Sequence, residues 1–470
     1  MARRCIFLLA DGAREDLFRE LLSSGRLPRI AEELVAVGSY VSAVTVFPST
    51  TGPAYAPFLM GKFPGRCNLP GIRWLDRYRY ASTIFSLDRM RSYVGIESLL
   101  FNRDISTRFK TMFEIVRRPS ASILNEFTRG VSRGGNKTGL RGSILKAKAN
   151  YDRSWDAVDR FGAERLLGVV ENGGVEFVYC VFTAIDHYSH LYHPFHRKVL
   201  ESYAFLDETV GRLVEVLRRR GELDDTLIVI SSDHGLTATH THFDSVGYLR
   251  ERGYKTLYYP LVFRHWRDAE AATMISGNSM THIYLKSPEG WGRTTTYEEA
   301  ADLVSDLVER EGIDIVAGVD GECNVRIRSR RGEAAVRMDG EGFIRYTPLD
   351  GGDPFGYGPL PERMSLDEAL RLTSETPYPD APLQLLQIFE SPRSGDLVVS
   401  ASVGYDLRSR FENPEHCSSH GSLARDHMMV PLVVNRPLRR GLARTADLFP
   451  TMLEHLGYPV PEGIDGESLF

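Results

Sequence analysis

One short stretch near the middle of the chain most constrains the fold. Thr226–Ile230 is an apolar, β-branched run, which is typical of a strand buried on both faces of a parallel sheet. The next five residues, 231–235, read Ser-Ser-Asp-His-Gly. They place a carboxylate and an imidazole at the carboxyl end of the strand, where open α/β sheets bind their ligands. The stretch predicts an α/β fold with Asp233 and His234 at a metal or ligand site. A satisfied turn is the alternative for this tripeptide alone.

Two further apolar runs end in the same way. Cys5–Ala10 is followed by Asp11, and the run Val175–Thr183 is followed by Asp186. A carboxylate at the end of a buried strand costs free energy unless it is paired or binds a metal ion. His190 lies four residues after Asp186, so one helical turn would place both side chains on one face. These endings predict that several strands deliver ligands to one edge of the sheet.

A hydroxyl-rich turn follows an expected strand at residues 40–47. Residues 48–52 read Pro-Ser-Thr-Thr-Gly and lead into an expected helix at residues 53–61. A threonine at a helix N-terminus faces backbone N–H groups, which suits both an attacking oxygen and a phosphate. An N-cap threonine is the structural alternative.

Together the segments supply carboxylates, imidazoles and one hydroxyl. The candidate residues are Asp11, Thr51, Asp186, His190, Asp233, His234 and His420. Mixed carboxylate and imidazole ligands fit two divalent ions, which can stabilise both the attacking and the leaving oxygen of a phosphoryl transfer. A metal ion also lowers the pKa of a bound hydroxyl, as a threonine nucleophile requires near neutral pH.

In their order along the chain, these motifs resemble the alkaline phosphatase superfamily, and most closely its nucleotide pyrophosphatase/phosphodiesterase (type I phosphodiesterase) branch. The motifs are Asp11-Gly12-x-Arg14, Phe47-Pro48-Ser49-x-Thr51, Asp186-x-x-x-His190, Asp233-His234-Gly235 and His420-Gly421, with a closing helix and tail at residues 446–457 and 465–469. The resemblance implies two zinc ions. One would be held by Asp186, His190 and His420, and the other by Asp11, Asp233 and His234.

The same resemblance implies a role for the hydroxyl. Thr51 would be the nucleophile, would bridge toward the second metal ion and would form a phospho-threonine intermediate, with Thr50 as a lesser candidate. Manganese is the alternative to zinc, since sites built from Asp and His accept both metals.

One position departs from this branch. Its members place an asparagine three residues after the nucleophile, where it helps to hold a phosphate oxygen, and this chain has Ala54 there. Candidate replacements for substrate binding are Lys62, Arg66, Asn68 and Arg73. The departure puts a preference for diesters in doubt more than it does membership of the superfamily.

The expected fold is an alkaline-phosphatase-like α/β sandwich with a mostly parallel central sheet, helices on both faces and an inserted α+β subdomain. Residues 1–245 and 396–470 form the predicted catalytic core, residues 246–395 the insertion, and residues 62–150 a candidate lid. Residues 103–148 contain eleven Lys and Arg against three Asp and Glu. This excess favours a solvated face, with a lid over an anionic substrate or a surface for acidic lipid as alternatives.

Charge, cysteine content and apolar run lengths bear on the class of partner and on the cellular compartment that we expect. The net charge of −5 gives no argument for nucleic acid. The candidate site and the family resemblance imply a small phosphate ester as substrate, such as a nucleotide or a lipid headgroup. The five cysteines are odd in number and scattered, which indicates reduced thiols rather than a disulfide framework. The first apolar run is too short for a signal peptide, and no run is long enough for a membrane span. We therefore expect a cytoplasmic protein.

The predicted function is metal-dependent hydrolysis of a phosphodiester or a nucleotide pyrophosphate. The alternatives are a phosphomonoesterase or a phosphoryl or phospho-alcohol transferase on the same site, and a non-catalytic binding protein of the same fold. The complete ligand set argues against the binding protein. A sulfatase is disfavoured because Thr51 cannot become the formylglycine that those enzymes make from cysteine or serine.

Overall fold

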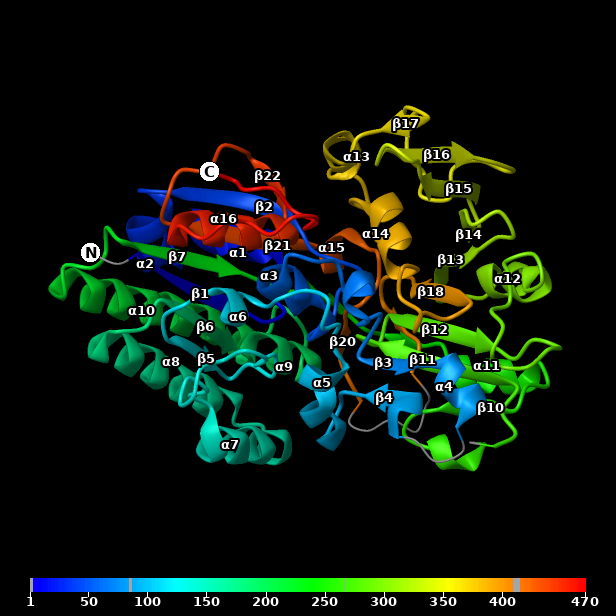
Figure 1. The fold of residues 1–470 in the computed structure, drawn as a ribbon, viewed down its shortest axis with the longest axis horizontal. Helices are drawn as coiled ribbons and strands as arrows, with labels where there is room; N and C mark the ends of the chain where they lie inside the picture. The colour runs from blue at the N-terminus through cyan, green and yellow to red at the C-terminus, as the bar shows by residue number, and fades with distance from the viewer. Residues whose placement is uncertain (1–2, 84–86, 266, 409–414) are drawn as a thin grey trace.

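Two β-sheets lie next to each other, and helices cover both (Figure 1). We describe the protein from a computed structural model, which covers residues 3–83, 87–265, 267–408 and 415–470. The first sheet has seven strands and the second has nine.

The seven-stranded sheet contains the strands whose ends carry the candidate ligands. Four neighbouring strands, β7, β1, β6 and β5, run parallel, whereas β21 runs antiparallel to both of its neighbours and β22 is parallel to β2. This confirms the predicted mostly parallel sheet. Every residue of β1, β6 and β7 is buried, because helices cover both faces, and this explains their continuous apolar sequences. The order is β22 (Leu442–Arg444), β2 (Ser39–Val44), β21 (Met429–Val434), β7 (Thr226–Ser231), β1 (Arg4–Ala10), β6 (Phe177–Phe182), β5 (Ser120–Ile123).

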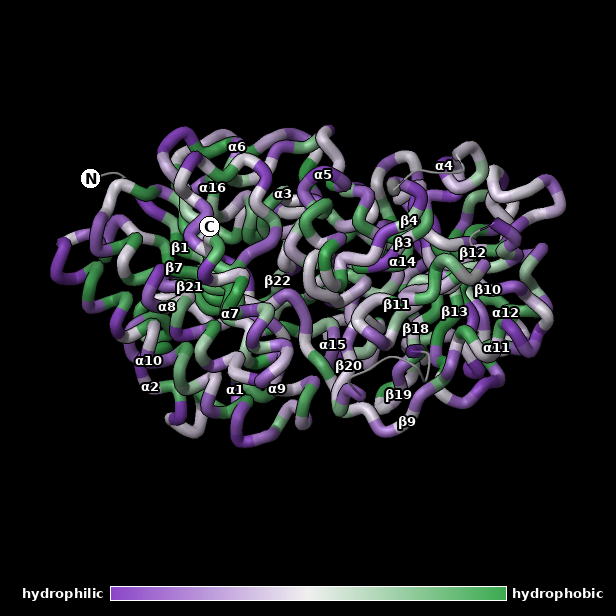
Figure 2. Tube along the Cα trace, turned by 90° about the horizontal axis from the view of Figure 1, so that it is seen from below, coloured by the Kyte–Doolittle hydropathy of each residue, from purple (hydrophilic) through white to green (hydrophobic). Residues whose placement is uncertain are grey.

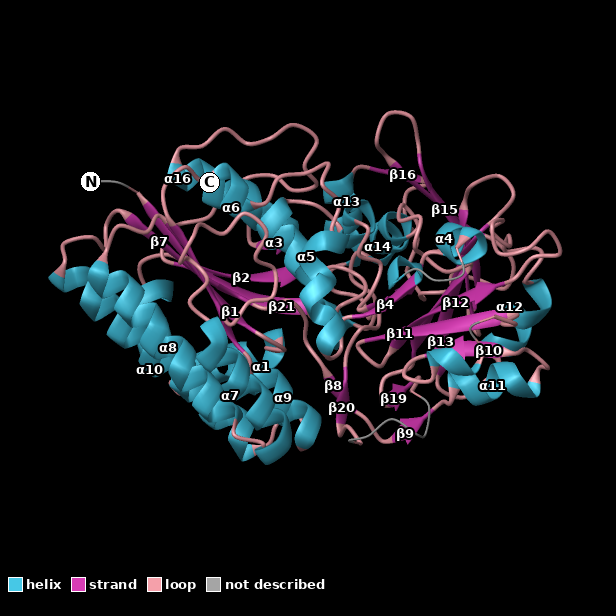
Figure 3. Ribbon diagram, turned by 60° about the horizontal axis from the view of Figure 1, so that its bottom comes forward, coloured by secondary structure: helices cyan, strands magenta, loops and turns pink. Residues whose placement is uncertain are grey.

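Helices cover this sheet on both faces, as predicted (Figure 3). One face carries α7 (Gly139–Asp152), α8 (Trp155–Asn172), α9 (Ala184–Leu191) and α10 (Arg197–Arg219). The other carries α3 (Ala56–Met60), α6 (Met112–Ile115) and α16 (Leu448–Leu456). The remaining helices of this half are α1 (Glu15–Ser23), α2 (Pro28–Ile30), α5 (Phe101–Asp104) and α15 (Arg425–Met428).

The second sheet is antiparallel apart from its first pair, β10 and β11. One hydrophobic cluster joins it to α13 and α14, and another joins it to α11 and α12. The strand order is β10 (Thr256–Tyr258), β11 (Ala271–Ser276), β12 (Met280–Leu285), β18 (Leu397–Ala401), β13 (Ile313–Val319), β14 (Val325–Ser329), β15 (Gly332–Met338), β16 (Ile344–Pro348), β17 (Arg363–Met364). The helices are α11 (Ser245–Glu251), α12 (Ala301–Val308), α13 (Leu366–Thr373) and α14 (Ala381–Ile388).

Two strands lie outside the divisions expected from the sequence. β18, which falls in the predicted core segment 396–470, pairs with β12 and β13 inside the second sheet. β5, which falls in the candidate lid 62–150, is the edge strand of the central sheet. An apolar run predicts a strand but not the sheet in which the strand pairs. The second sheet therefore extends to Ala401, and the candidate lid is partly a piece of the core.

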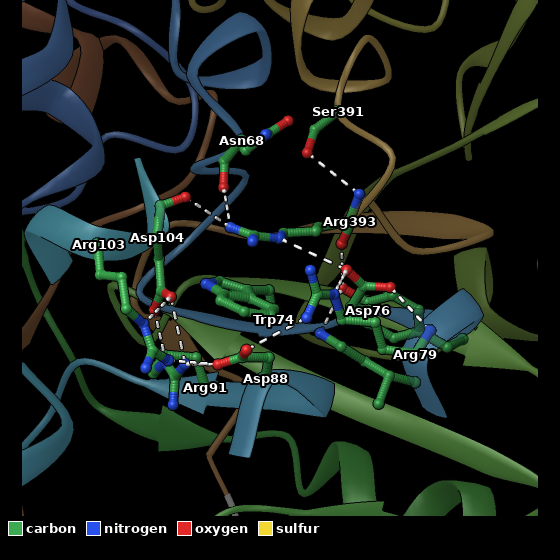
Figure 4. Close-up of polar contacts among 12 residues, drawn as sticks. Asn68, Trp74, Asp76, Arg79, Asp88, Arg91, Arg103, Asp104, Ser391 and Arg393 are labelled. Carbon is green, nitrogen blue, oxygen red and sulfur yellow. Dashed lines mark hydrogen bonds and ion pairs between the residues drawn. The ribbon is translucent and has the colours of Figure 1, made fainter. Parts of the chain in front are cut away.

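A polar network attaches the 68–104 segment to the second half of the molecule (Figure 4). Arg393 donates to the backbone carbonyls of Asn68 and Asp104, at 3.0 Å each, and its guanidinium lies 3.9 Å from the Trp74 ring. Arg91 donates to the Asp104 carboxylate at 2.6 Å. This segment includes α4 (Arg77–Ser82) and the hairpin of β3 (Arg73–Leu75) and β4 (Met90–Ser92).

A buried ion pair joins the two halves at β22. Arg444 donates to both oxygens of Asp380, at 2.7 and 2.8 Å, and its guanidinium also donates to the carbonyl of Leu366. Asp380 precedes α14 and is fully buried. A bidentate pair of this kind fixes the position of α14 relative to the central sheet.

Hydrophobic residues concentrate along the strands of both sheets, and hydrophilic residues along the outer loops (Figure 2). All five cysteines are free in the structure. Among the residues that the structure describes, we find no helix with the length and apolar content that a bilayer crossing needs.

Candidate metal centre and nucleophile

The ends of β1 and β7 bring three candidate ligands together. The two strands are parallel neighbours, so Asp11 after β1 lies beside Asp233 and His234 after β7. The backbone N–H of Gly12 donates to Asp233 Oδ1 at 3.4 Å. His234 Nε2 lies 3.6 Å from Asp11 Oδ1 and 3.5 Å from Asp233 Oδ2. All of these side chains are buried.

The helix α9 delivers two more ligands from the end of β6. Its first turn is fixed by Asp159 of α8, whose carboxylate accepts the backbone N–H groups of Thr183 and Ala184. Asp186 and His190 are four residues apart on α9, and His190 Nε2 lies 3.3 Å from Asp186 Oδ1. The sequence-predicted placement of both side chains on one helical face is present in the structure.

Thr51 lies at the centre of these groups. Its Oγ1 is 3.2 Å from Asp11 Oδ1 and 3.0 Å from His234 Nε2. The chain turns directly after it at Gly52, whose φ of +93° a residue with a side chain rarely adopts. Thr50 differs, because its buried Oγ1 has no hydrogen-bond partner among the described residues. The geometry therefore aims Thr51, rather than Thr50, at the candidate ligands.

Each of the three candidate imidazoles has its Nδ1 next to a backbone carbonyl oxygen. Nδ1 of His190 lies 2.8 Å from the carbonyl of Ser418, Nδ1 of His420 lies 2.9 Å from that of Ser49, and Nδ1 of His234 lies 3.0 Å from that of Gly235. A carbonyl can only accept, so each ring carries a proton on Nδ1. In the neutral ring, Nε2 is then left with a lone pair. Backbone carbonyls orient metal-binding histidines in this way.

The ligand atoms form two compact groups, and within each group they lie within 4.8 Å of one another. One group is Asp186, His190 and His420, and it equals the set that the family resemblance implies. The other is Asp11, Asp186 and His234, so Asp186 belongs to both groups. Asp233 is in neither group, although its Oδ2 lies 3.5 Å from His234 Nε2. A carboxylate between two cation positions can bridge them. Asp233 stays a predicted ligand through its Oδ2.

Unpaired buried oxygens show that this cluster fits cations. Asp186 Oδ1 and Asp233 Oδ2 are buried without a hydrogen-bond donor among the described residues. When His190 is neutral, as a metal ligand must be, and carries its proton on Nδ1, its Nε2 presents a second acceptor to Asp186 Oδ1. Buried acceptors that face each other need a proton or a metal ion between them. The donor set of carboxylates and imidazoles suits divalent zinc or manganese.

The crowding of charge shifts several pKa values in the metal-free protein. Burial, followed by repulsion from Asp233 and Asp186, raises the pKa of Asp11 well above its usual value. Burial also raises the pKa of Asp186, but attraction from His190 and other imidazoles outweighs it and the net pKa is low. Burial lowers the pKa of His420, which keeps the ring neutral as a ligand must be.

The four residues proposed for substrate binding have other partners. Lys62 contacts the carbonyl of Gly463 and the Asp465 carboxylate, and Arg66 pairs with Asp465 and Glu390. These carboxylates already neutralise the charges of Lys62 and Arg66, which argues against a substrate role for the two basic residues. The backbone carbonyl of Asn68 accepts from Arg393, and Arg73 Nε donates to Ser92 Oγ. A substrate role for Asn68 and Arg73 stays a prediction.

Three neighbours of the site were not predicted from the sequence. The ring of His416 lies 4.4 Å from that of His190, and Asn278 Nδ2 contacts His416 Nδ1 at 2.9 Å. His416 stands in the same small-residue loop as His420, which was the available signal. Asn278 comes from the turn between β11 and β12, and no sequence pattern links it to the site. The ring of Phe101 is another neighbour, because a Cβ added to Gly52 would lie 3.3 Å from it.

Comparison with known proteins decides the family. The profile of the type I phosphodiesterase / nucleotide pyrophosphatase family matches residues 5–423. The chain belongs to this family. The match confirms the resemblance stated from the motifs, and it makes this type I phosphodiesterase family member a phosphoric ester hydrolase.

Solved structures of other proteins share the fold. Murine ectonucleotide pyrophosphatase/phosphodiesterase 5, an inactive variant in complex with AMP, is similar with a TM-score of 0.58 and 11% identity, over 98% of this chain and 97% of that one. Phosphonoacetate hydrolase from Sinorhizobium meliloti 1021, in complex with phosphonoformate, is similar with a TM-score of 0.60 and 16% identity, over 97% and 96%. These likenesses confirm the alkaline-phosphatase-like fold of the family member.

A shorter match involves a curated relative. The catalytic subunit of human GPI ethanolamine phosphate transferase 3 is 30% identical over 90 residues, which is 19% of this chain and 8% of the relative. The corresponding mouse protein is 28% identical over a stretch of the same length. The chain therefore matches a small part of the length of these relatives.

Proposed function

We propose that the protein hydrolyses a phosphodiester or a nucleotide pyrophosphate through a phospho-threonine on Thr51, assisted by two divalent cations. One observation carries the proposal. Thr51 Oγ1 lies within 3.2 Å of both Asp11 Oδ1 and His234 Nε2, next to buried carboxylate oxygens that lack a donor. The nucleophile and the candidate ligands therefore converge on one point.

Seven residues would hold the cations. They are Asp186, His190 and His420 at one position and Asp11, Asp233, His234 and Thr51 at the other, with Asp186 close to both. When bound, divalent ions supply charge neutralisation for the phosphate and a lower pKa for the threonine hydroxyl. Zinc is the preferred cation and manganese the alternative.

The proposed reaction consists of two displacements at phosphorus. Thr51 Oγ1 attacks phosphorus and loses its proton, and the ester bond to the leaving alcohol or nucleotide breaks. Asp11 Oδ1 is the nearest carboxylate acceptor for that proton, at 3.2 Å. Water then attacks the phospho-threonine, which restores the hydroxyl and releases the phosphate monoester. The proton that Asp11 takes from Thr51 passes to the leaving group, and the attacking water supplies the proton that restores the Thr51 hydroxyl.

The test compares two chromogenic esters. Turnover of bis-p-nitrophenyl phosphate and of p-nitrophenyl phosphate would be measured with zinc or manganese for the wild type, Thr51→Ala and Thr50→Ala. Thr50→Ala is the matched control, since its hydroxyl has no partner among the described residues and stands one residue away. We expect faster diester turnover, a loss of at least about 10³-fold in Thr51→Ala and near wild-type rates in Thr50→Ala.

Each alternative gives a different result. A preference for the monoester would mean that Ala54, which replaces the asparagine of this branch, has moved the enzyme toward monoesters. Activity that survives in Thr51→Ala would refute the phospho-threonine. No turnover of either ester by the metal-loaded wild type, together with tight metal binding, would favour a binding protein.

A second candidate function is transfer of a phospho-alcohol group to an alcohol acceptor. The 90-residue match to the GPI ethanolamine phosphate transferase favours it, because a transferase uses the same first displacement and replaces water with an alcohol. Product analysis of diester turnover in the presence of ethanolamine or glycerol separates the two. A new phosphodiester product would support transfer, and its absence would leave hydrolysis.

A further inference from the structure

The helix α7 exposes large apolar side chains along its outer face. Leu140 is 78% exposed, Ile144 57% and Tyr151 93%. Ala147, which lies between them, is also exposed. Their spacing of four, three and four residues places all four side chains on one line along the helix. Exposed apolar residues that form a continuous stripe mark an interaction site more often than single ones do.

The inner face of α7 is already occupied, so the outer stripe does not serve the core. Gly142 and Ala149 are buried, and Leu145 packs on the main hydrophobic cluster. A Cβ added to Gly142 would lie 2.9 Å from the Phe161 ring of α8. At 100° per residue, these inner positions point about 180° away from the stripe. The helix α7 therefore has two apolar faces, one against α8 and one toward solvent.

Basic side chains border the outer stripe. Residues 137–153 contain five cations, Lys137, Arg141, Lys146, Lys148 and Arg153, and one acid, Asp152, which gives a net charge of +4 in a chain whose total is −5. Around the helix axis, at 100° per residue, Lys148 lies about 70° from the centre of the stripe. Arg141 lies about 90° from it, and its guanidinium is 5.8 Å from the Phe161 ring of α8. The side chain of Lys148 is 66% exposed and lies 3.4 Å from the Asp152 carboxylate.

We propose that α7 docks on an anionic lipid bilayer as an interfacial helix. An apolar stripe with cations along its side is the pattern of helices that lie in the plane of a membrane surface, where the apolar side chains enter the headgroup region. The positive charge of α7 complements acidic lipid, although the protein as a whole is negative. Tyr151 suits the interface, since its ring is apolar and its hydroxyl is polar.

The position of α7 would place the bound membrane near the candidate site. It packs on α8, which in turn contacts α9, the helix that carries Asp186 and His190 (Figure 3). A membrane under α7 would therefore lie close to the end of the molecule that holds the candidate site. This inference goes beyond the proposed function and does not depend on it.

The test is co-sedimentation of the metal-loaded protein with vesicles. One set contains phosphatidylcholine alone, and the other contains phosphatidylcholine with about 30% phosphatidylserine. Three variants are compared with the wild type: Leu140→Ser/Ile144→Ser/Tyr151→Ser on the stripe, Arg141→Gln/Lys148→Gln beside it, and Leu349→Ser/Val403→Ser as a matched control. The control removes exposed apolar side chains from the other half of the molecule.

We expect the wild type and the control to bind the anionic vesicles, and to bind phosphatidylcholine vesicles at least tenfold more weakly. The stripe variant should lose at least tenfold in binding to anionic vesicles. The charge variant should lose about 30-fold, because each cation near such a surface contributes about fivefold. Unchanged thermal midpoints would show that the variants fold.

Three results would overturn the proposal. They are failure of the wild type to bind anionic vesicles, equal binding by the wild type and the stripe variant, and a wild-type dimer in sedimentation velocity that the stripe variant dissociates. The last result would assign the stripe to contact with a second copy of the chain.

Discussion

The substitution Asp11→Asn should have opposite effects on stability in the absence and in the presence of metal. The candidate ligand atoms of Asp11, Asp186 and His234 lie within 4.8 Å of one another in a buried site. Two carboxylates at that separation repel by about 3.5 kcal/mol when both are ionised and the effective dielectric constant is about 20. Asparagine has the same shape and keeps an oxygen that can accept from Thr51.

Partial protonation limits this repulsion. The pKa of Asp11 is raised well above its usual value, first by burial and then by its carboxylate neighbours, so the wild type relieves part of the repulsion by binding a proton. We therefore expect Asp11→Asn to be more stable than the wild type by about 2 kcal/mol in chelator at pH 8. With metal at about 1,000 times its dissociation constant, the wild type should gain about 4 kcal/mol and the variant much less.

The assay is urea unfolding followed by circular dichroism, in chelator and in zinc or manganese. The order of the two midpoints should reverse when metal is added. The reasoning would be refuted by a variant that is less stable than the wild type in chelator, or by a wild type whose midpoint does not move with metal. Either result would mean that the acidic cluster is held by protons and hydrogen bonds and is not built for cations.

Three further outcomes follow from single contacts. Arg444→Met should cost about 3–5 kcal/mol in unfolding free energy, because it leaves the buried Asp380 carboxylate without its cation. Adding Asp380→Asn should restore part of the loss, because asparagine removes the charge and tolerates the φ of +60° at this position. Burial lowers the pKa of His282 to about 4. The contribution of the neutral ring to the free energy of unfolding is therefore complete above about pH 6.5 and is lost as the pH falls toward 4. Between pH 6.5 and pH 5, the free energy of unfolding should fall by about 2 kcal/mol less in His282→Gln than in the wild type, as measured by urea unfolding at both pH values. Phe101→Ala should lower kcat/KM for the diester more than Phe101→Leu does, because the ring lies against Gly52 beside the nucleophile, and steady-state kinetics of both variants would check this.

The sequence predicts the ligand-bearing part of the fold well, for a physical reason. A parallel strand covered on both faces must be apolar throughout, so β1, β6 and β7 stand out, and the polar residue that ends each one is conspicuous. Asp11 and Asp233 could therefore be placed at one edge of the sheet from the pattern of apolar runs alone. The spacing of Asp186 and His190 likewise predicts a shared helical face.

Features that depend on distant pairing could not be predicted in this way. β18 has the same apolar pattern as a core strand, and only its pairing with β12 and β13 assigns it to the second sheet. Lys62 and Arg66 were predicted to bind an anion, because their partner Asp465 lies 399 residues after Arg66 and the local sequence does not show it. Local patterns describe the chemistry of a side chain but not the neighbour that neutralises it.

Contacts between imidazoles and backbone carbonyls connect the Thr51 turn to the His420 loop, and the His420 loop to α9. The Ser49 carbonyl, two residues before Thr51, orients His420, and the Ser418 carbonyl, two residues before His420, orients His190. A displacement of the nucleophile turn must therefore rotate His420, and a displacement of the His420 loop must rotate His190. We therefore expect the turn and both imidazoles to move together, so that the fit of a phosphate at Thr51 would affect how firmly α9 holds a cation. Substrate affinity and metal affinity would then change together.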